Sequence, residues 1–376
     1  MSKRKIIIVG TAYPYRGGLA AFNERLAREY LHQDNDVQIF TFTLQYPKFL
    51  FPGKSQYSIE NPPADLHIHR KINSINPFNW IKIGREIKKL NADIMITKFW
   101  LPFMAPCFGT IERIVRKNNK TKVISILDNV IPHEKRIADK LFVRYFVNST
   151  QGFVAMSKSV LNDLGLFDKE KPRILCPHPL YDNFGLKLNR EEALNMLELD
   201  TSFRYILFFG IIRAYKGLDL LIEAFYRLRK SNDNVKLIIA GEFYEDKEQY
   251  KSLIKKYNLE EDIILRDEFI PDSKVNIYFS ACDIVAQPYK SATQSGVTQI
   301  AYHFEKSMLV TDVGGLSEIV PDKKVGYVVN TDPDEIAQAL DDFFKNNRQQ
   351  EFEKNILIEK EKYSWENMVN AIDSLL

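Results

Sequence analysis

Short apolar runs, rich in β-branched residues, alternate with stretches of helical period along this chain of 376 residues. Strands that are apolar throughout and separated by helices are typical of parallel sheets covered on both faces. The first series comprises residues 5–9, 37–42, 93–97, 123–127 and 152–155, and the second comprises residues 205–209, 236–240, 263–266, 283–286, 308–311 and 327–329. The pattern predicts an α/β protein with two Rossmann-like domains.

The segment CPHPLYDNFGLKLNR, residues 176–190, is rich in proline and asparagine and separates the two series. We therefore predict a first domain of residues 1–177 and a second of residues 178–360, with the ligand site in a cleft between them. In residues 361–376 the apolar residues recur at helical spacing, at Trp365, Met368, Ile372 and Leu375. We expect this last segment to form a helix that packs back on the first domain.

The cysteines and the apolar segments argue against several classes of protein. Cys107, Cys176 and Cys282 lack the spacing of a disulfide framework or a zinc site. The first apolar run is too short for a signal peptide, and the longest uncharged stretch, residues 99–111, is shorter than the roughly 20 residues that cross a bilayer. We expect a cytoplasmic protein.

Charge is unevenly divided along the chain. Residues 1–175 contain 28 basic and 15 acidic residues, whereas the remainder contains 24 basic and 34 acidic residues. A basic half attracts anionic partners, and no zinc-finger, helix-turn-helix or RNP pattern points to nucleic acid. The helical segments 81–90 and 113–120 combine cations with apolar residues, which predicts peripheral contact with the anionic inner face of the cytoplasmic membrane. A lysine-rich face that is merely solvated is the alternative.

A helix start with a glycine follows the predicted strand 283–286. Apolar residues recur at helical spacing from this point onward (Val297, Ile300, Ala301 and Phe304), and Ser295 is a good N-cap. The unpaired N–H groups of a first helical turn attract phosphate oxygens, and Gly296 leaves room for a ligand. We predict that Ser295, Gly296 and Val297 hold a diphosphate; an ordinary capped helix is the alternative.

Cations and glycines follow two other predicted strands. Arg213 and Lys216 lie between the strand that ends at Gly210 and the next helix, and such loops bind anions in parallel sheets. A solvated charged loop is the alternative. Gly17 and Gly18, in TAYPYRGGLAAF, do not form GxGxxG, which argues against a dinucleotide-binding dehydrogenase. They would let the backbone of the first domain approach a bound donor.

In their order and spacing these segments resemble the GT-B glycosyltransferases of family GT4, the retaining group 1 transferases of bacterial polysaccharide and lipopolysaccharide assembly. The resemblance covers nearly the whole chain and is carried by KIIIVGTAYPYRGGLAAFNERLA, DNVIPHEKR, VAMSKSVLNDL, FFGIIRAYKGLDLLIEAF, LIIAGE and DIVAQPYKSATQSGVTQIAYHFEKSMLVTDVGGLSEIV. It implies two Rossmann-like domains that face each other across a cleft, with a glycan or lipid-linked acceptor on the first and a UDP-sugar or GDP-sugar donor on the second. It also implies that no cofactor and no metal are required.

The resemblance assigns the donor diphosphate to Lys216 and an arginine. The family arginine directly follows the strand glycine, where this chain has Ile211, so that Arg213 is the substitute. The family's two glutamates, eight positions apart, would fall on Ala292 and Ile300. This chain therefore resembles a divergent member that lacks both glutamates.

Three polar residues are expected to contact the donor in place of the missing carboxylates. Gln294 and Gln299 carry hydrogen-bond donors and acceptors beside the helix start, although Gln299 would be a solvated helix residue in the alternative interpretation. Glu318, in GGLSEIV, is a further candidate for hydroxyls of the sugar or the ribose. Its alternative role is to lie at the positive end of a helix.

The loop after residues 123–127 often carries a histidine in the family. Here Asp128 and Asn129 follow the strand, and His133 comes four residues later. We expect Asp128 to accept a proton from the acceptor hydroxyl and His133 to bind that hydroxyl or a phosphate, unless residues 132–134 only cap a helix. No protein nucleophile is predicted. The missing glutamates leave two other functions open, an inactive nucleotide-sugar-binding subunit and another GT-B enzyme such as a sugar-nucleotide epimerase.

Overall fold

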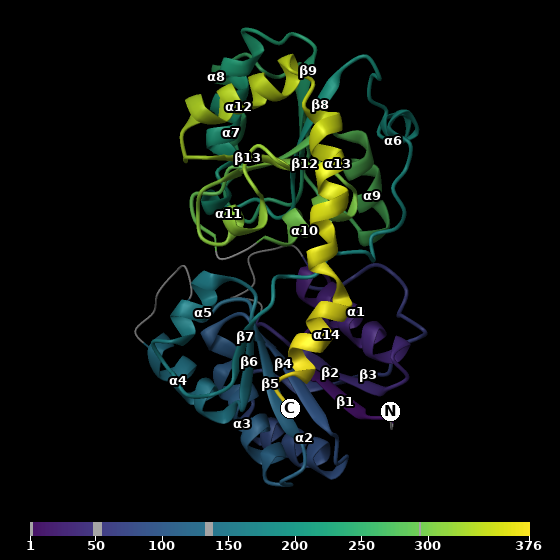
Figure 1. Cartoon of the computed structure of the whole chain (residues 1–376), viewed down its shortest axis with the longest axis vertical. Helices are drawn as coiled ribbons and strands as arrows, with labels where there is room; N and C mark the ends of the chain where they lie inside the picture. The colour runs from purple at the N-terminus through teal and green to yellow at the C-terminus, as the bar shows by residue number, and fades with distance from the viewer. Residues whose placement is uncertain (1–2, 48–54, 132–137, 293–294) are drawn as a thin grey trace. The chain divides into compact units, whose positions relative to one another are not determined.

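The computed structural model describes residues 3–47, 55–131, 138–292 and 295–376 (Figure 1). The chain divides into two compact units. Unit 1 comprises Met1–Pro179 and Tyr363–Leu376, and unit 2 comprises Leu180–Lys362. Each unit contains its own parallel sheet with helices on both faces.

The sheet of unit 1 has seven strands in the order β3-β2-β1-β4-β5-β6-β7, and all neighbours are parallel. The strands are β1 (Lys5–Val9), β2 (Asp36–Leu44), β3 (Ile68–Asn73), β4 (Ile94–Phe99), β5 (Lys122–Leu127), β6 (Gly152–Ala155) and β7 (Arg173–Leu175). The helices are α1 (Gly18–His32), α2 (Pro77–Lys89), η2 (Pro102–Met104), α3 (Ala105–Arg116), α4 (Asp139–Ser149), α5 (Lys158–Leu164) and α14 (Trp365–Asp373). The strand order reverses between β1 and β4, which is where ligands bind in open parallel sheets.

Five of these strands were predicted from the sequence, and the two edge strands were missed. β3, with the sequence IHRKIN, has two exposed residues, and β7 has only three residues, all half-buried. An edge strand is paired on one side only, so it does not need the continuous apolar run that marks the central strands.

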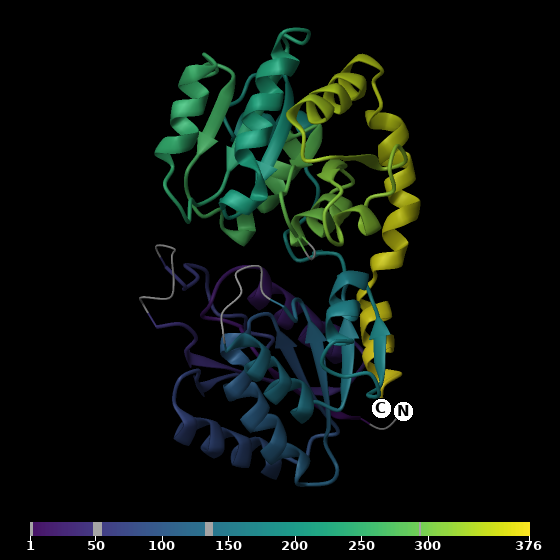
Figure 2. The same cartoon turned by 90° about the vertical axis from the view of Figure 1, so that its left-hand side faces the viewer.

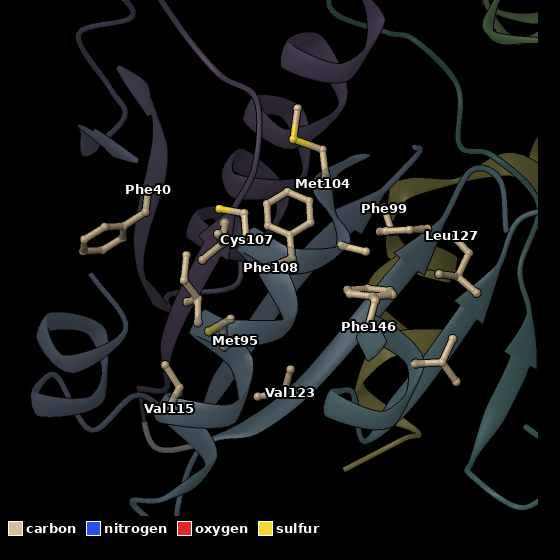
Figure 3. Packing of buried hydrophobic residues seen from close by; sticks show 14 of the residues in the cluster. Phe40, Met95, Phe99, Met104, Cys107, Phe108, Val115, Val123, Leu127 and Phe146 are labelled. Carbon is tan, nitrogen blue, oxygen red and sulfur yellow. The ribbon is translucent and has the colours of Figure 1, made fainter. Parts of the chain in front are cut away.

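Apolar side chains of α2, α3, α4 and α5 fill the space against one face of this sheet. Figure 3 shows Cys107, Phe108 and Val115 of α3 and Phe146 of α4 within this layer. Phe99 of β4 stacks on Phe146 of α4 with the ring centres 4.1 Å apart. The carboxyl group of Glu112 is buried within this layer. Thr97 Oγ1 and Thr150 Oγ1 donate hydrogen bonds of 2.9 and 2.8 Å to the two carboxyl oxygens of the buried Glu112. Burial raises the pKa of Glu112 to about 7, although the hydroxyl donors oppose the shift.

Unit 2 has six parallel strands in the order β10-β9-β8-β11-β12-β13, and all six were predicted. They are β8 (Arg204–Phe209), β9 (Val235–Ala240), β10 (Ile263–Arg266), β11 (Ile284–Gln287), β12 (Ser307–Thr311) and β13 (Gly326–Val329). The helices are α6 (Arg190–Met196), η3 (Ala214–Lys216), α7 (Leu218–Arg229), α8 (Glu248–Lys256), α9 (Asp272–Ala281), α10 (Gly296–His303), α11 (Leu316–Ile319), α12 (Pro333–Lys345), α13 (Gln349–Glu359) and η4 (Lys360–Tyr363).

The last helix, α14, belongs to unit 1, as predicted (Figure 2). It contacts α1 and β6. The ring of Trp365 lies 5.0 Å from that of Phe22, and the guanidinium of Arg25 lies 5.2 Å from the centre of the Trp365 ring. The ion pair between Arg4 and Asp373, at 2.8 Å, fixes its other end.

Three further observations bear on the class of protein. No helix in the described part of the chain is long and apolar enough to cross a membrane. The cysteines are buried and free, and burial raises the pKa of Cys176 to about 11 and that of Cys282 to about 12. The described residues contain no group of three or more side chains that could hold a metal ion.

Candidate functional site

The loop after β8 is held in a conformation that requires glycine. Gly210 follows the strand with φ +99°, and Gly217, at the start of α7, has φ +67°. A Cβ at Gly217 would lie 1.9 Å from the carbonyl oxygen of Pro288, which follows β11. No side chain fits there, so Gly217 lets η3 lie directly against the end of β11.

This close approach positions Lys216. The residue is only 9% exposed, and its ammonium group lies 3.4 Å from the point where a Cβ of Gly210 would stand and 5.4 Å from the ring centre of Tyr289. No acidic side chain pairs with Lys216 among the residues described. Burial lowers the pKa of Lys216, and Arg213 lowers it further, whereas Tyr215 opposes the shift. A buried cation without a counter-charge is costly, and an anion would remove that cost.

The start of α10 lies beside Lys216. Val297 Cγ2 is 3.8 Å from the same Cβ point at Gly210. Ser295 caps the helix, since its Oγ accepts a hydrogen bond of 3.2 Å from the N–H of Val297, and the Tyr289 hydroxyl lies 3.3 Å from that Oγ. The structure thus brings the ends of β8 and β11 and the first turn of α10 into one site, which we call the lysine site (Gly210, Lys216, Tyr289, Ser295 and Val297).

The other predicted donor-site residues of unit 2 are placed as follows. The space beside Gly296 is occupied, because a Cβ there would lie 2.8 Å from Cε2 of Tyr181. The guanidinium of Arg213 lies 5.4 Å from the ring centre of Tyr244, and no ion pair holds it among the described residues. Glu318 is exposed on the short helix α11. Gln294 lies outside the described residues.

Gln299 is fully buried, so its interpretation as a solvated helix residue is wrong. It is 0% exposed, and neither its amide nitrogen nor its amide oxygen has a hydrogen-bond partner within the described residues. Gln287, the last residue of β11, is likewise buried, and its amide has no partner among the described residues. It was not predicted as a site residue. The only signal in the sequence was a glutamine at the end of the apolar run DIVAQ. Two buried amides without partners cost the folded state free energy.

We expect Gln299→Leu to raise the free energy of unfolding of the unliganded protein by about 1–3 kcal/mol, because leucine fills a similar volume without burying unpaired polar atoms. Urea unfolding monitored by circular dichroism measures the change. Gln287→Leu is the matched variant and should shift stability in the same direction. A loss of stability in both variants would show that the amides have partners in the folded protein.

In unit 1 the predicted Asp128 follows β5 and is nearly buried. Its Oδ1 forms an ion pair of 2.8 Å with the ammonium of Lys98, which is 1% exposed and lies 3.5 Å from the ring centre of Phe22. Burial lowers the pKa of Lys98, and Asp128 opposes the shift. Lys98 was not predicted, although a lone lysine in the apolar run IMITKF was a detectable signal.

His178 was also missed. It is buried, its ring lies 5.0 Å from that of Phe22, and its Nδ1 donates a hydrogen bond of 2.7 Å to the Pro179 carbonyl. Burial lowers the pKa of His178 to about 3, and the nearby Lys98 adds to the shift. His178 is therefore neutral at physiological pH.

The other predicted residues of unit 1 that the structure describes lie at the start of α1 and after β5. Gly17, with φ +94°, caps α1, and nothing lies within 4 Å of a Cβ built on it. Gly18 is exposed, and Asn129 is half-buried. His133 lies outside the described residues. Open space beside Gly17 is consistent with the close approach of a ligand to this backbone.

The opposite pKa shifts of Glu112 and His178 predict how stability depends on pH. Between pH 4.5 and about 7 the folded state keeps the proton on Glu112 and the unfolded state loses it, so this residue lowers stability as pH rises. Between about pH 3 and 6.5 the unfolded state binds a proton on His178 and the folded state does not, so this residue raises stability as pH rises.

We therefore expect Glu112→Gln, which keeps the hydrogen bonds to the two threonines, to remove only the first effect. The stability of Glu112→Gln minus that of the unmodified protein should increase by about 1.4 kcal/mol per pH unit from pH 4.5 to about 7. Urea unfolding over a pH series measures this difference, from which all other titrating groups cancel. A difference that is constant with pH would contradict the raised pKa of Glu112.

Comparison with known proteins agrees with this architecture. Residues 189–362 match the family model of glycosyl transferases group 1. The chain is 24% identical over 375 residues to the uncharacterized glycosyltransferase MJ1178 of Methanocaldococcus jannaschii, covering 98% of this chain and 96% of that protein. It is 30% identical over 200 residues to the lipopolysaccharide 1,2-N-acetylglucosaminetransferase of Salmonella typhimurium, covering 49% of this chain and 50% of that one.

Among solved structures, Anabaena HepE in complex with UDP and glucose resembles the chain with a TM-score of 0.72 at 14% identity, covering 99% of this chain and 98% of that one. The predicted GT-B fold class is confirmed by this likeness and by the two parallel sheets.

Proposed function

We propose that this protein, whose residues 189–362 match the family model of glycosyl transferases group 1, is a retaining, metal-independent glycosyltransferase of the GT4 type. It moves a sugar from a UDP-sugar or a GDP-sugar to a glycan or lipid-linked acceptor in the assembly of surface polysaccharide or glycoconjugate. The single observation that carries the proposal is Lys216, a buried ammonium group that has no acidic partner among the described residues and lies beside the first turn of α10.

A diphosphate fits the lysine site by charge and by hydrogen bonding. Lys216 and Arg213 supply two positive charges, and the N–H groups of the first turn of α10 supply donors at the positive end of the helix. HepE, which has the same fold, binds UDP, and this supports a nucleotide-linked donor.

Unit 1 supplies the acceptor site in this proposal. The acceptor hydroxyl oxygen attacks the anomeric carbon, the bond from that carbon to the diphosphate oxygen breaks, and the hydroxyl proton passes to the leaving phosphate. Lys216 stabilises the negative charge that develops on the diphosphate. Asp128, held by Lys98, orients the acceptor by accepting a hydrogen bond from a second, neighbouring hydroxyl of that acceptor.

The acceptor and the location follow from charge and from one relative. Unit 1 contains 28 basic and 17 acidic residues, which favours a phosphate-bearing acceptor at the anionic inner face of the cytoplasmic membrane. The Salmonella relative acts on lipopolysaccharide, and this supports a surface glycan as the product.

The test is a thermal unfolding series with UDP and GDP, each with magnesium and with a chelator. One nucleotide should raise the melting temperature in the chelator, because a ligand that binds only the folded state stabilises it by mass action. Sugar donors that contain the stabilising nucleotide are then screened for transfer, and NMR determines the anomeric configuration of the product. No stabilisation of folded protein by either nucleotide would refute the donor site. Binding without turnover would indicate a nucleotide-sugar-binding subunit, and turnover without an acceptor would indicate an epimerase.

A further inference from the structure

Helices α2, α3 and α4 pack over one face of the unit 1 sheet, and α3 contacts both of the others (Figure 1). The three helices are strongly basic. Their cations are Lys82, Arg85, Lys88, Lys89, Arg113, Arg116, Lys140 and Arg144, and their acids are Glu86, Glu112 and Asp139. Glu112 is buried in the core, so it contributes nothing to the outer surface. The outer surface of this layer is therefore positive.

The start of α2 displays an aromatic side chain to solvent. The side chain of Asn76 accepts hydrogen bonds of 3.0 and 3.2 Å from the N–H groups of Phe78 and Asn79, with Pro77 as the first helical residue. Trp80 Nε1 donates a hydrogen bond of 2.7 Å to the carbonyl of Asn73. These bonds fix the first turn of the helix. Phe78 is nevertheless 84% exposed, so packing within the chain does not account for it.

The opposite sides of α2 differ sharply. Ile83, Gly84 and Ile87 are buried, and a Cβ at Gly84 would lie 3.0 Å from Cβ of Ile114 in α3. The exposed side contains five residues at helical spacing, which we call the basic helical face: Phe78, Ile81, Lys82, Arg85 and Lys89. Together with Glu86 these residues line one continuous surface hollow.

We propose that the basic helical face docks this protein on an anionic lipid bilayer, with Phe78 and Ile81 in the interface and the three cations among the headgroups. Exposed apolar residues next to cations on one helix side are what an interfacial helix requires. On α4, which contacts the other side of α3, Leu141 and Tyr145 are exposed beside Arg144, so the same combination recurs on the same layer. The proposal rests on the proposed function only in that a lipid-linked acceptor would lie in the same bilayer.

The first test is sedimentation of the full chain with phosphatidylcholine vesicles, with and without phosphatidylglycerol, at low and high salt. Binding should require phosphatidylglycerol and decline with salt, because each cation near an anionic surface adds about fivefold to the partition constant. Phe78→Ser with Ile81→Ser should reduce the partition constant about tenfold or more. Leu166→Ser, at a leucine of unit 1 that is 70% exposed but belongs to none of these three helices, should leave it unchanged.

The second test separates insertion from charge attraction alone. In a Phe78→Trp variant, vesicles that contain phosphatidylglycerol should shift the fluorescence of the new tryptophan to shorter wavelength and expose it to quenching by brominated lipid. The same measurement on the unmodified protein corrects for its own tryptophans. The proposal would be overturned by vesicle binding without the wavelength shift or the quenching, or by no binding at low salt. An equal loss of the partition constant in Leu166→Ser would also overturn it.

The result of the vesicle-binding experiments does not depend on whether the lysine site binds a donor. The Phe78→Ser, Ile81→Ser variant should keep any nucleotide-induced thermal shift of the unmodified protein, because these residues belong to unit 1 and the lysine site belongs to unit 2. Vesicle binding without a nucleotide response would refute the proposed function alone. A nucleotide response without vesicle binding would refute the docking surface alone.

Discussion

Lys216→Met will raise the stability of the unliganded protein and weaken its binding of the nucleotide that stabilises the unmodified chain. The apo protein should gain about 1–3 kcal/mol, because a buried ammonium group without a counter-charge is replaced by an apolar side chain of similar length. Affinity for the nucleotide should fall by about 1.5–3 kcal/mol, the loss of charge-assisted hydrogen bonds to phosphate. Transfer should slow by about 10²–10³-fold, because the charge on the leaving diphosphate loses its stabilisation.

Opposite effects on stability and affinity are what distinguish a ligand-binding cation from a structural one. Lys290→Met is the matched control, because Lys290 follows β11 on the same unit but forms an exposed ion pair of 2.6 Å with Asp219. That pair is worth less than about 1 kcal/mol, so both stability and affinity should change little. Calorimetric titration and thermal unfolding of the three proteins measure both quantities. If the Lys216→Met variant is less stable and still binds nucleotide normally, Lys216 does not bind the nucleotide.

The central strands could be predicted from the sequence because a strand that is buried on both faces is apolar along its whole length. β8, β9 and β12 are covered by helices on both sides, so every position must be apolar or nearly so. The start of α10 was equally readable, since the Ser295 cap and the apolar period after it are local features. The position of Lys216 in the loop after a strand could be predicted from the sequence, but its burial could not.

The features that were missed depend on contacts between distant parts of the chain. Lys98 becomes a buried partner of Asp128 only because β4 and β5 pair in the register that sets Phe99 opposite Leu127. His178 is enclosed by Phe22, from a helix more than 150 residues earlier. No local sequence pattern predicts either contact. The space beside Gly296 is likewise filled by Tyr181. No spacing in the sequence predicts this contact.

The pair of Lys98 and Asp128 is expected to show the largest effect on stability. Lys98→Met should destabilise the protein by about 3–5 kcal/mol, because it leaves the nearly buried carboxylate of Asp128 without its cation. Adding Asp128→Asn to that variant should recover a large part of the loss, since no uncompensated charge then remains. Chemical unfolding of the two single variants and the double variant measures the coupling directly.

The same variants separate a role in folding from a role at the acceptor. Asp128→Asn alone should leave the nucleotide response of unit 2 intact and lower the transfer rate, because the amide orients the acceptor hydroxyl less strongly than a carboxylate. Its melting temperature should fall as well, since Lys98 then lacks its partner and remains close to the ring of Phe22. If the double variant regains stability but not transfer, Asp128 acts on the acceptor. If transfer returns together with stability, the pair serves the fold alone, and the acceptor is oriented by other groups of unit 1.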